Sequence, residues 1–116
     1  MQPRINSYRF GYIVVDKEEY TRDLIITPSD VKPNWWRIEG HRLQLDDIRE
    51  YLDIDVDAVV IGTGYDGLMR VDEEVIEHYR KRGIEVYVSN TREAVNKYNE
   101  LVEKGKRVLG MFHLTC

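Results

Sequence analysis

Apolar residues follow different patterns in the two halves of this chain. The first half, residues 1–56, contains short stretches rich in aromatic and β-branched residues, separated by residues that favour turns. Gly11 interrupts the first of these stretches and predicts a bend or bulge. The predicted strands of this half are Ser7–Phe10, Tyr12–Val15 and Asp23–Thr27. The second half, residues 57–116, alternates instead between apolar runs and segments with helical spacing.

The end of the first half predicts a loop, a hairpin and a short helix. The segment PSDVKP, between Pro28 and Pro33, has the composition of a loop. A hairpin is predicted from Trp35–Ile38 and Arg42–Leu45, across the three residues between them. Asp46 or Asp47 is then expected to cap a short helix. Its apolar positions are Ile48, Tyr51 and Leu52.

The second half predicts the order β-α-β-α-β. Its elements are a strand at Asp57–Gly62, a helix at about Asp72–Arg82, a strand at Ile84–Val88, a helix from Asn90 to about Lys104 and a strand at Arg107–Phe112. The first strand is continuously apolar, which is typical of strands that are covered on both faces. Asn90 and Glu93 resemble a capping box, and Gly83 and Gly105 are typical helix-terminating residues. This order predicts an α/β fold, with helices packed on a largely parallel sheet, in a single domain spanning 1–116.

The charge balance and the single cysteine narrow the class of protein. The chain has 17 Lys and Arg against 21 Asp and Glu, a formal net charge of −4, so it lacks the basic excess of a nucleic-acid-binding domain. Cys116 is the only cysteine, which rules out an internal disulfide. No apolar run approaches the ~18 residues of a membrane span, and the first residues resemble neither a signal peptide nor a presequence. We therefore expect a cytoplasmic protein, monomeric or weakly self-associating.

The segment Gly62–Gly67 matches the GxGxxG pattern of dinucleotide-binding proteins. In those proteins the third glycine lies in the first turn of a helix whose amides bind the pyrophosphate. Here the predicted helix begins near Asp72, five residues after Gly67, and three consecutive carboxylates at its start would repel a phosphate. The next strand also ends without the acidic residue that binds ribose. We therefore predict no NAD or FAD cofactor and interpret the motif as a turn that needs glycine, with another small anion as the alternative.

The carboxyl ends of the predicted parallel strands define a candidate pocket. In open α/β sheets these ends meet at one edge, where ligands usually bind. The polar side chains and glycines there suit a small anion or metabolite, and Cys116 lies close in sequence. The predicted pocket residues are Gly62, Thr63, Gly64, Tyr65, Asp66, Asn90, Thr91, His113 and Thr115.

No set of residues identifies a reaction, and we predict no catalytic residues. A nucleophilic pair of Cys116 and His113 is disfavoured because the terminal carboxylate of Cys116 opposes thiolate formation. In an extended segment, residues i and i+3 also point to opposite faces. The alternative is that the tail packs over the edge of the sheet.

The remaining charged patterns favour structural interpretations. The triad of Asp53, Asp55 and Asp57 opens like a calcium loop, but the glycine and glutamate of such a loop are missing. The three histidines do not have zinc-site spacing, so no metal is predicted. The basic clusters at residues 80–82 and 104–107 lie at predicted helix ends, where cations offset the helix dipole.

Trp35 and Trp36 are candidates for a protein-binding surface. Adjacent residues of a strand face opposite sides, so one indole is expected to enter the core and the other to lie near the surface. An exposed tryptophan is a typical anchor for a partner protein. Packing beneath a neighbouring loop is the alternative.

Three ordered segments, VVIGTGYDGLMRV, RGIEVYVSNTREAVNKYNELVEKGKRV and the terminal FHLTC, resemble the adipogenesis-associated Mth-domain family. Mitochondrial complex I assembly factor 3 is a more distant member, and Trp35–His41 resembles the family's Trp-Arg…Gly…His segment. The resemblance implies three layers: a small antiparallel β layer plus a mixed central sheet of about five strands with helices on both faces. It also implies that Gly62 and Gly64 are family features. No enzymatic activity follows from it, and the nearest role among relatives is assisting assembly of a membrane complex. We therefore predict a non-catalytic interaction or assembly-assisting protein, and a small-molecule or anion binder as the alternative.

Overall fold

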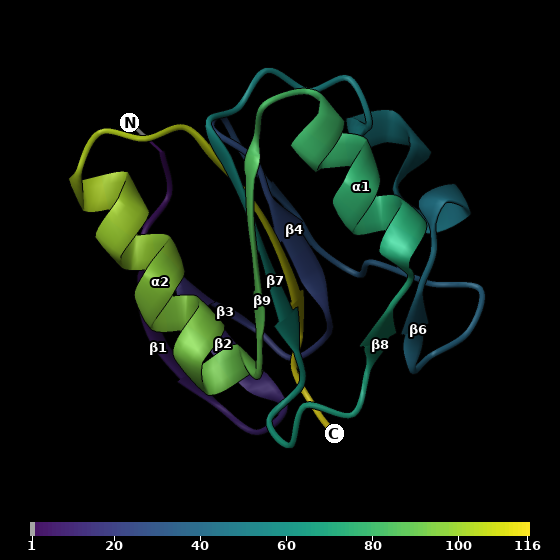
Figure 1. Ribbon diagram of the computed structural model, residues 1–116. Helices are drawn as coiled ribbons and strands as arrows, with labels where there is room; N and C mark the ends of the chain where they lie inside the picture. Colours follow the sequence, from purple (N-terminus) through teal and green to yellow (C-terminus); the bar gives the residue numbers. More distant parts are fainter. Residues whose placement is uncertain (1) are drawn as a thin grey trace.

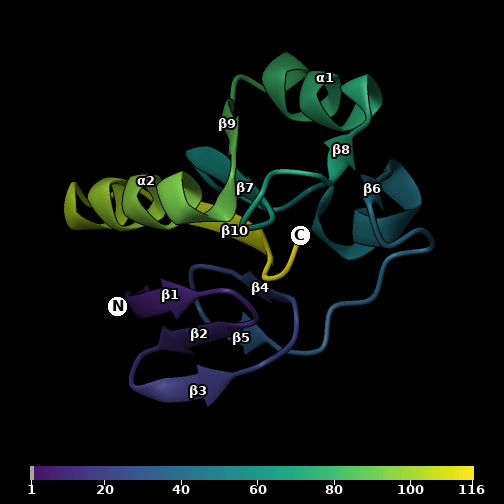
Figure 2. The ribbon, with the colours of Figure 1, turned by 90° about the horizontal axis from the view of Figure 1, so that it is seen from below.

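The computed structural model describes residues 2–116, which form three layers (Figures 1 and 2). The middle layer is a five-stranded sheet with the strand order β5-β4-β10-β7-β9. Seen from below, helix α2 and the three-stranded sheet β1-β2-β3 lie on one side of it, and α1 lies on the other (Figure 2). The elements are β1 (Ile5–Arg9), β2 (Tyr12–Val15), β3 (Glu18–Tyr20), β4 (Leu24–Ile26), β5 (Val31–Lys32), β6 (Arg42–Leu43), the 3₁₀-helix η1 (Leu45–Tyr51), β7 (Ala58–Thr63), β8 (Arg70–Val71), α1 (Glu73–Lys81), β9 (Glu85–Ser89), α2 (Thr91–Glu103) and β10 (Val108–His113).

The central sheet is mixed. Strand β7 runs parallel to both of its neighbours, β10 and β9. Strand β4 is antiparallel to β10 and to β5, so β4 alone runs against the other four. The mixed sheet, the small antiparallel layer and the helices on both faces confirm the fold implied by the family resemblance. The sheet is not fully parallel, because β4 and β5, from the first half of the chain, complete one side of it and β4 runs antiparallel to its neighbours.

Strand β7 is covered on both faces, which explains why its sequence does not alternate between apolar and polar residues. All six of its residues are buried. Ala58 and Val60 contribute to a core cluster beneath α2 and the three-stranded sheet. Val59 and Ile61 contribute to a second cluster beneath α1 and η1. Because the strand has a core on each face, alternation between apolar and polar residues disappears.

The second half follows the sequence prediction to within one or two residues. Helix α2 is capped as expected, since the Asn90 side chain accepts a hydrogen bond from the Glu93 amide at 3.0 Å. Its buried face packs on the sheet through Ala94, Val95, Tyr98 and Leu101. Helix α1 begins at Glu73 and follows β8, so no helix starts within the glycine motif.

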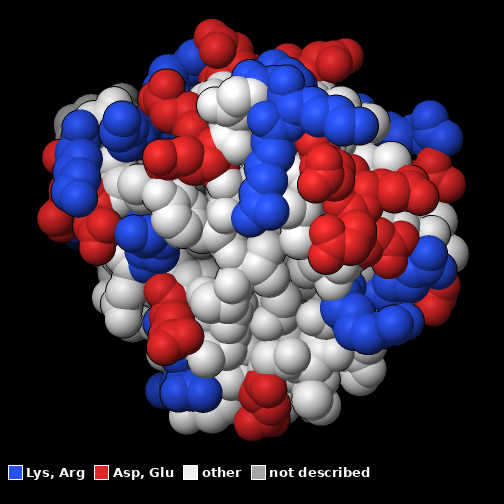
Figure 3. Space-filling view, viewed as in Figure 1, with Lys and Arg blue, Asp and Glu red and all other residues white. Residues whose placement is uncertain are grey.

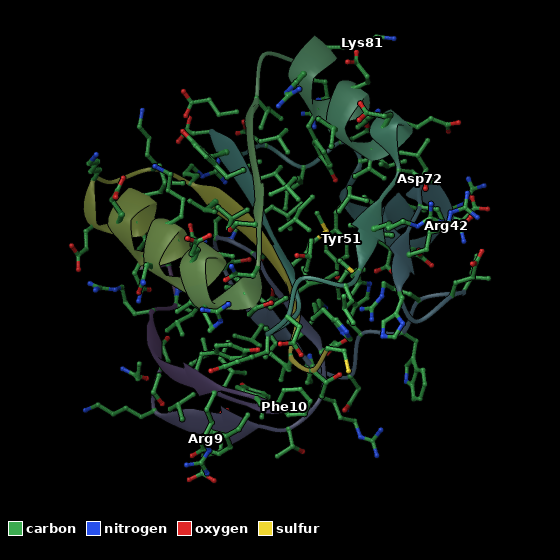
Figure 4. All side chains as sticks on the ribbon, turned by 60° about the horizontal axis from the view of Figure 1, so that its bottom comes forward. Arg9, Phe10, Arg42, Tyr51, Asp72 and Lys81 are labelled. Carbon is green, nitrogen blue, oxygen red and sulfur yellow. The ribbon has the colours of Figure 1, made fainter. Side chains whose placement is uncertain are left out.

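The predicted hairpin between Trp35–Ile38 and Arg42–Leu45 is wrong. Residues 35–38 form no strand, and β6 instead pairs in parallel with β8, far along the chain. The Arg42 guanidinium holds this pairing by donating to both carboxylate oxygens of Asp72, at 3.0 and 2.9 Å. Figure 4 shows these two side chains pointing toward one another. The turn itself is present, since the Arg42 amide donates to the Glu39 carbonyl at 3.2 Å, but the strand that follows it pairs with β8 instead of with residues 35–38.

Three other expectations for the first half need correction. The predicted loop PSDVKP contains β5, a two-residue strand on β4. Strand β3 was not predicted. The N-cap of η1 is Gln44 rather than Asp46 or Asp47, and Asp47 serves as the third helical residue, accepting the Gln44 amide at 3.0 Å. Strands of two or three residues are too short to show a period, which is why the sequence missed them.

Candidate functional site

Three chain segments meet at one edge of the central sheet: the loop after β7, the start of α2 and the tail after β10. The buried Thr91 hydroxyl joins them. It accepts the Gly64 amide at 2.8 Å and donates to the His113 carbonyl at 2.6 Å. The Thr91 amide in turn donates to the Gly64 carbonyl at 2.9 Å. The structure thus brings the predicted pocket segments together through one side chain.

The tail packs directly against the glycine loop. Tyr65 donates its amide to the Thr115 carbonyl at 2.7 Å, and Leu68 donates its amide to the Cys116 carbonyl at 3.0 Å. Gly64 has φ +109°, and a Cβ there would lie 2.5 Å from the Thr115 oxygen. Two of the loop amides that could bind an anion therefore already donate to the tail.

The other predicted pocket residues have mainly structural contacts. Gly62 lies close beneath Thr91, since a Cβ at Gly62 would be 2.7 Å from the Thr91 hydroxyl oxygen. The Thr63 hydroxyl donates to the Ser89 carbonyl at 3.0 Å, and Asn90 caps α2. Asp66 is exposed. A pocket at this edge stays a prediction.

The surface over this edge carries no concentrated positive charge. Figure 3 has the viewpoint of Figure 1 and shows an uncharged strip over the lower part of β9, with a basic side chain at its upper end and an acidic one below it, near the loop after β7. Basic and acidic side chains are interspersed on both sides of the strip. This face therefore lacks the electrostatic footprint that nucleic-acid binding needs.

A buried network of charged groups lies beside the tail. Asp23, just before β4, accepts a hydrogen bond from the His113 Nδ1 at 2.7 Å and forms an ion pair with the Arg37 Nη2 at 2.8 Å, both at Oδ2. Its other oxygen accepts the Leu114 amide at 2.8 Å. Arg37 also donates to the Gly40 carbonyl, from Nη2 at 2.7 Å and from Nε at 3.2 Å. The network connects the loop of residues 35–40 to β10, the central strand of the sheet.

The contacts of His113 determine its tautomer. Its Nδ1 faces the Asp23 carboxylate, which can only accept, and the Arg37 guanidinium, which can only donate. Because the contact with Asp23 is the shorter, at 2.7 Å against 3.1 Å for Arg37, we assign the proton to Nδ1, which donates to Asp23. In the neutral ring the lone pair is on Nε2, which is buried and has no partner. An imidazole oriented by a carboxylate is an arrangement found in general bases. Within residues 2–116, however, neither a hydroxyl nor the Cys116 thiol hydrogen-bonds to Nε2.

Two pKa shifts follow from this environment. Burial alone would raise the pKa of Asp23, but the hydrogen bonds from His113 and the Leu114 amide and the charge of Arg37 outweigh it, so its pKa is lowered. Burial raises the pKa of Tyr8 to about 12. The Tyr8 hydroxyl donates to the Leu114 carbonyl at 2.7 Å, so Tyr8 and Asp23 hold Leu114 by its two main-chain groups.

The loop of residues 35–40 forms one wall of a cleft of about 350 Å³. Trp35 is half-buried and donates its indole N–H to the Asp47 carbonyl at 3.3 Å. Trp36 is 76% exposed and Ile38 is 69% exposed. The two indoles therefore differ as expected, although the segment is a loop rather than a strand. The cleft is lined by Thr21, Arg22, Asp23, Asn34, Trp35, Trp36, Arg37 and Gly40.

The sequence missed Asp23 and Arg37 as site residues. Arg37 lies inside the Trp-Arg…Gly…His segment that carries part of the resemblance, and this was the only available signal. Asp23 lies 90 residues from His113, and no local pattern marks it.

Two searches of the described chain, residues 2–116, gave negative results. No group of three or more His, Cys, Asp or Glu side chains is arranged to hold a metal ion. None of the helices has the length and apolar character required to cross a bilayer.

Comparison with known proteins places the chain in a family. Residues 5–113 match the family described as "Protein of unknown function (DUF498/DUF598)". The chain belongs to this DUF498/DUF598 family. The crystal structure of conserved hypothetical protein PH1505 from Pyrococcus horikoshii OT3 is 30% identical to it. That match has a TM-score of 0.85 and covers 97% of this chain and 99% of that one.

Two further structures share the DUF498/DUF598 fold at lower identity. MT938 is 23% identical, with a TM-score of 0.78, and the match covers 98% of this chain and 99% of that chain. A Bordetella pertussis protein described as a Mth938-like domain is 16% identical, with a TM-score of 0.65. That match covers 97% of this chain and 85% of that one. At these identities the likeness shows the fold alone. The Mth-domain resemblance is thus confirmed at the level of family and fold.

Proposed function

We propose that this protein is a non-catalytic interaction module that assists the assembly of a partner protein, and that Trp36 is its main anchor. The proposal rests on one observation: Trp36 is 76% exposed beside Arg37, whose side chain is only 4% exposed. Because Arg37 is fixed by Asp23 and Gly40, the backbone of Trp36 cannot withdraw into the core. The indole is held at the surface before any partner arrives.

A tryptophan whose backbone is fixed at the surface suits a protein partner for two reasons. Ordering a flexible side chain opposes association, and a rigid loop has less freedom to lose. Large aromatic side chains also dominate the energetics of interfaces when they enter a partner's pocket. Hollows of about 350 and 280 Å³ adjoin Trp36, one lined by Arg37 and the other by Tyr51. The expected partner therefore presents an apolar pocket for the indole and side chains that fill these hollows.

The test compares Trp36→Ala with Leu68→Ala. Leu68 is also apolar and 57% exposed, but it lies on the glycine loop. A photo-crosslinking residue at position 38, where Ile38 is 69% exposed, leaves Trp36 in place and would first capture a partner, which is then purified and titrated against each variant. We expect Trp36→Ala to weaken binding by at least about 2 kcal/mol, roughly thirtyfold. We expect Leu68→Ala to change it by less than about threefold.

Two outcomes of this binding experiment would contradict the proposal. If the purified partner binds both variants like the unmodified chain, Trp36 is not an anchor and the proposal fails. If the only captured species is a second copy of this chain, the surface mediates self-association and the assembly role is lost.

The second candidate function, binding of a small molecule or anion at the Gly62–Gly67 edge, stays a prediction. Convergence of the polar groups supports it, but Tyr65 and Leu68 already donate their amides to the tail. A ligand there would have to displace residues 115 and 116. A cytoplasmic location likewise stays a prediction.

A further inference from the structure

One buried cation beside the cleft has unused hydrogen-bonding capacity. Nε and Nη2 of Arg37 are occupied by Gly40 and Asp23, but Nη1 is buried and has no hydrogen-bond partner among residues 2–116. An unpaired buried donor destabilises a fold, by more when it carries charge, so it usually has a ligand or a water. Arg37 also lines the cleft. Its unpaired nitrogen is therefore the feature of this cleft that points to a ligand.

The charge of the cleft favours an anion with a single negative charge. Two guanidinium groups, of Arg22 and Arg37, and one carboxylate, of Asp23, line it. The Asp23 oxygens already accept two hydrogen bonds and share an ion pair with Arg37, so Asp23 has little capacity left for a ligand. Arg22 makes no salt bridge within the described residues. The residues that line the cleft therefore have a net charge of one positive charge, and a dianion would be repelled by the Asp23 carboxylate.

The side chains that line the cleft favour a ligand whose negatively charged group is attached to a flat or apolar group. The Arg37 guanidinium lies over the Trp35 ring, 4.7 Å from its centroid, which fixes the plane of the cation. Trp36 forms another part of the wall and is free to turn, because most of its surface is exposed. Rotation of this indole would admit a ligand to the buried Nη1. A cleft of about 350 Å³ is at the small end of the range for ligand pockets.

We propose that the cleft binds a small organic monocarboxylate, with Arg37 Nη1 as the buried anchor, Arg22 as a second donor and the indoles of Trp35 and Trp36 as walls. This inference goes beyond the proposed function and does not require a protein partner. Carboxylates are the natural match for a guanidinium whose orientation is fixed.

The experiment is a titration followed by nuclear magnetic resonance of the indole and backbone N–H groups. The probes are acetate, benzoate and phenylpropionate, with benzamide as a neutral molecule of the same shape as benzoate, and inorganic phosphate. We expect benzoate or phenylpropionate to bind saturably and to shift the indole signals of Trp35 and Trp36. We expect benzamide to bind at least about tenfold more weakly than benzoate.

Substitutions then locate the contact. Arg37→Gln removes the anchor and should abolish binding, but it also breaks a buried ion pair and can unfold the chain. Arg22→Gln leaves that ion pair intact and should weaken benzoate binding by about three- to tenfold. The matched control is Arg49→Gln, at an arginine whose side chain is 75% exposed and which does not line the cleft. It should leave benzoate affinity unchanged.

Four results would overturn the proposal. The first is that none of the three carboxylates binds, and the second is that benzamide binds as tightly as benzoate. The third is that phosphate binds more tightly than any carboxylate, which would assign the cleft to a different anion. The last is that Arg22→Gln and Arg49→Gln have equal effects. Because the probes are small molecules, these outcomes are independent of whether Trp36 binds a protein.

Discussion

Replacing Gly64 by alanine tests how the tail closes the edge of the sheet. Gly64 has φ +109°, which a side chain rarely tolerates, and this strain alone costs about 1–3 kcal/mol. The new Cβ would also lie 2.5 Å from the Thr115 oxygen and 2.6 Å from the Cys116 oxygen, closer than real contacts allow. If the tail moves away, its hydrogen bonds from the amides of Tyr65 and Leu68 are lost. Each of these contributes about 1 kcal/mol. We expect Gly64→Ala to lower the free energy of unfolding by about 3–5 kcal/mol.

Gly67→Ala is the matched control for this substitution. Gly67 also has a positive φ, of +74°, but the nearest atoms to its Cβ would be at 3.6 and 3.7 Å, ordinary contact distances. Only the backbone cost remains, about 1–2 kcal/mol. Urea unfolding followed by tryptophan fluorescence measures the free energy of unfolding of both variants. In a thermal scan, Tm should fall by about 4 °C for each kcal/mol lost. Equal destabilisation of the two variants would refute the close packing of the tail against Gly64.

Two other predictions concern the groups that hold the tail. Thr91→Val leaves the Gly64 amide and the His113 carbonyl unpaired and should cost about 2–4 kcal/mol in urea unfolding. Thr91→Ser keeps the hydroxyl and should cost only about 1 kcal/mol, so equal losses would contradict the role of the hydrogen bonds. Because the pKa of Asp23 is lowered on folding, its stabilisation is present above the ordinary value of 3.8 and is lost as the pH falls through the folded-state pKa. Unfolding free energies measured from neutral pH to about pH 2 should therefore show the deficit of Asp23→Asn narrowing in acid, and a constant deficit would contradict this.

The sequence predicted the second half of the fold well because long elements carry redundant signals. Strand β7 is apolar from Ala58 to Ile61 since it has a core on each face, and α2 has both a cap at Asn90 and a buried stripe. The first half lacked such redundancy. Strands β5 and β6 have two residues each, as does β8 of the second half, and β6 pairs with β8, where Arg42 forms an ion pair with Asp72. No local pattern encodes a contact of that kind.

The candidate site was predictable only in part, for the same reason. His113 and Trp36 were identified because the end of a strand and a pair of tryptophans are visible in the sequence. The partners of His113 were not, since Arg37 lies 76 residues away and Asp23 lies 90 residues away. A buried charge network assembled from three distant segments appears only when the chain is folded.

The position of β10 at the centre of the sheet bears on how the chain folds during synthesis. The ribosome makes residues 108–113 after every other strand, yet this segment separates β4 from β7 and pairs with both. Until residues 108–113 have been synthesised, β4 and β7 each have an unpaired edge that can pair with another molecule. The sheet therefore cannot close gradually from the N-terminus, because β10 can join its two sides only after β4 and β7 have been made.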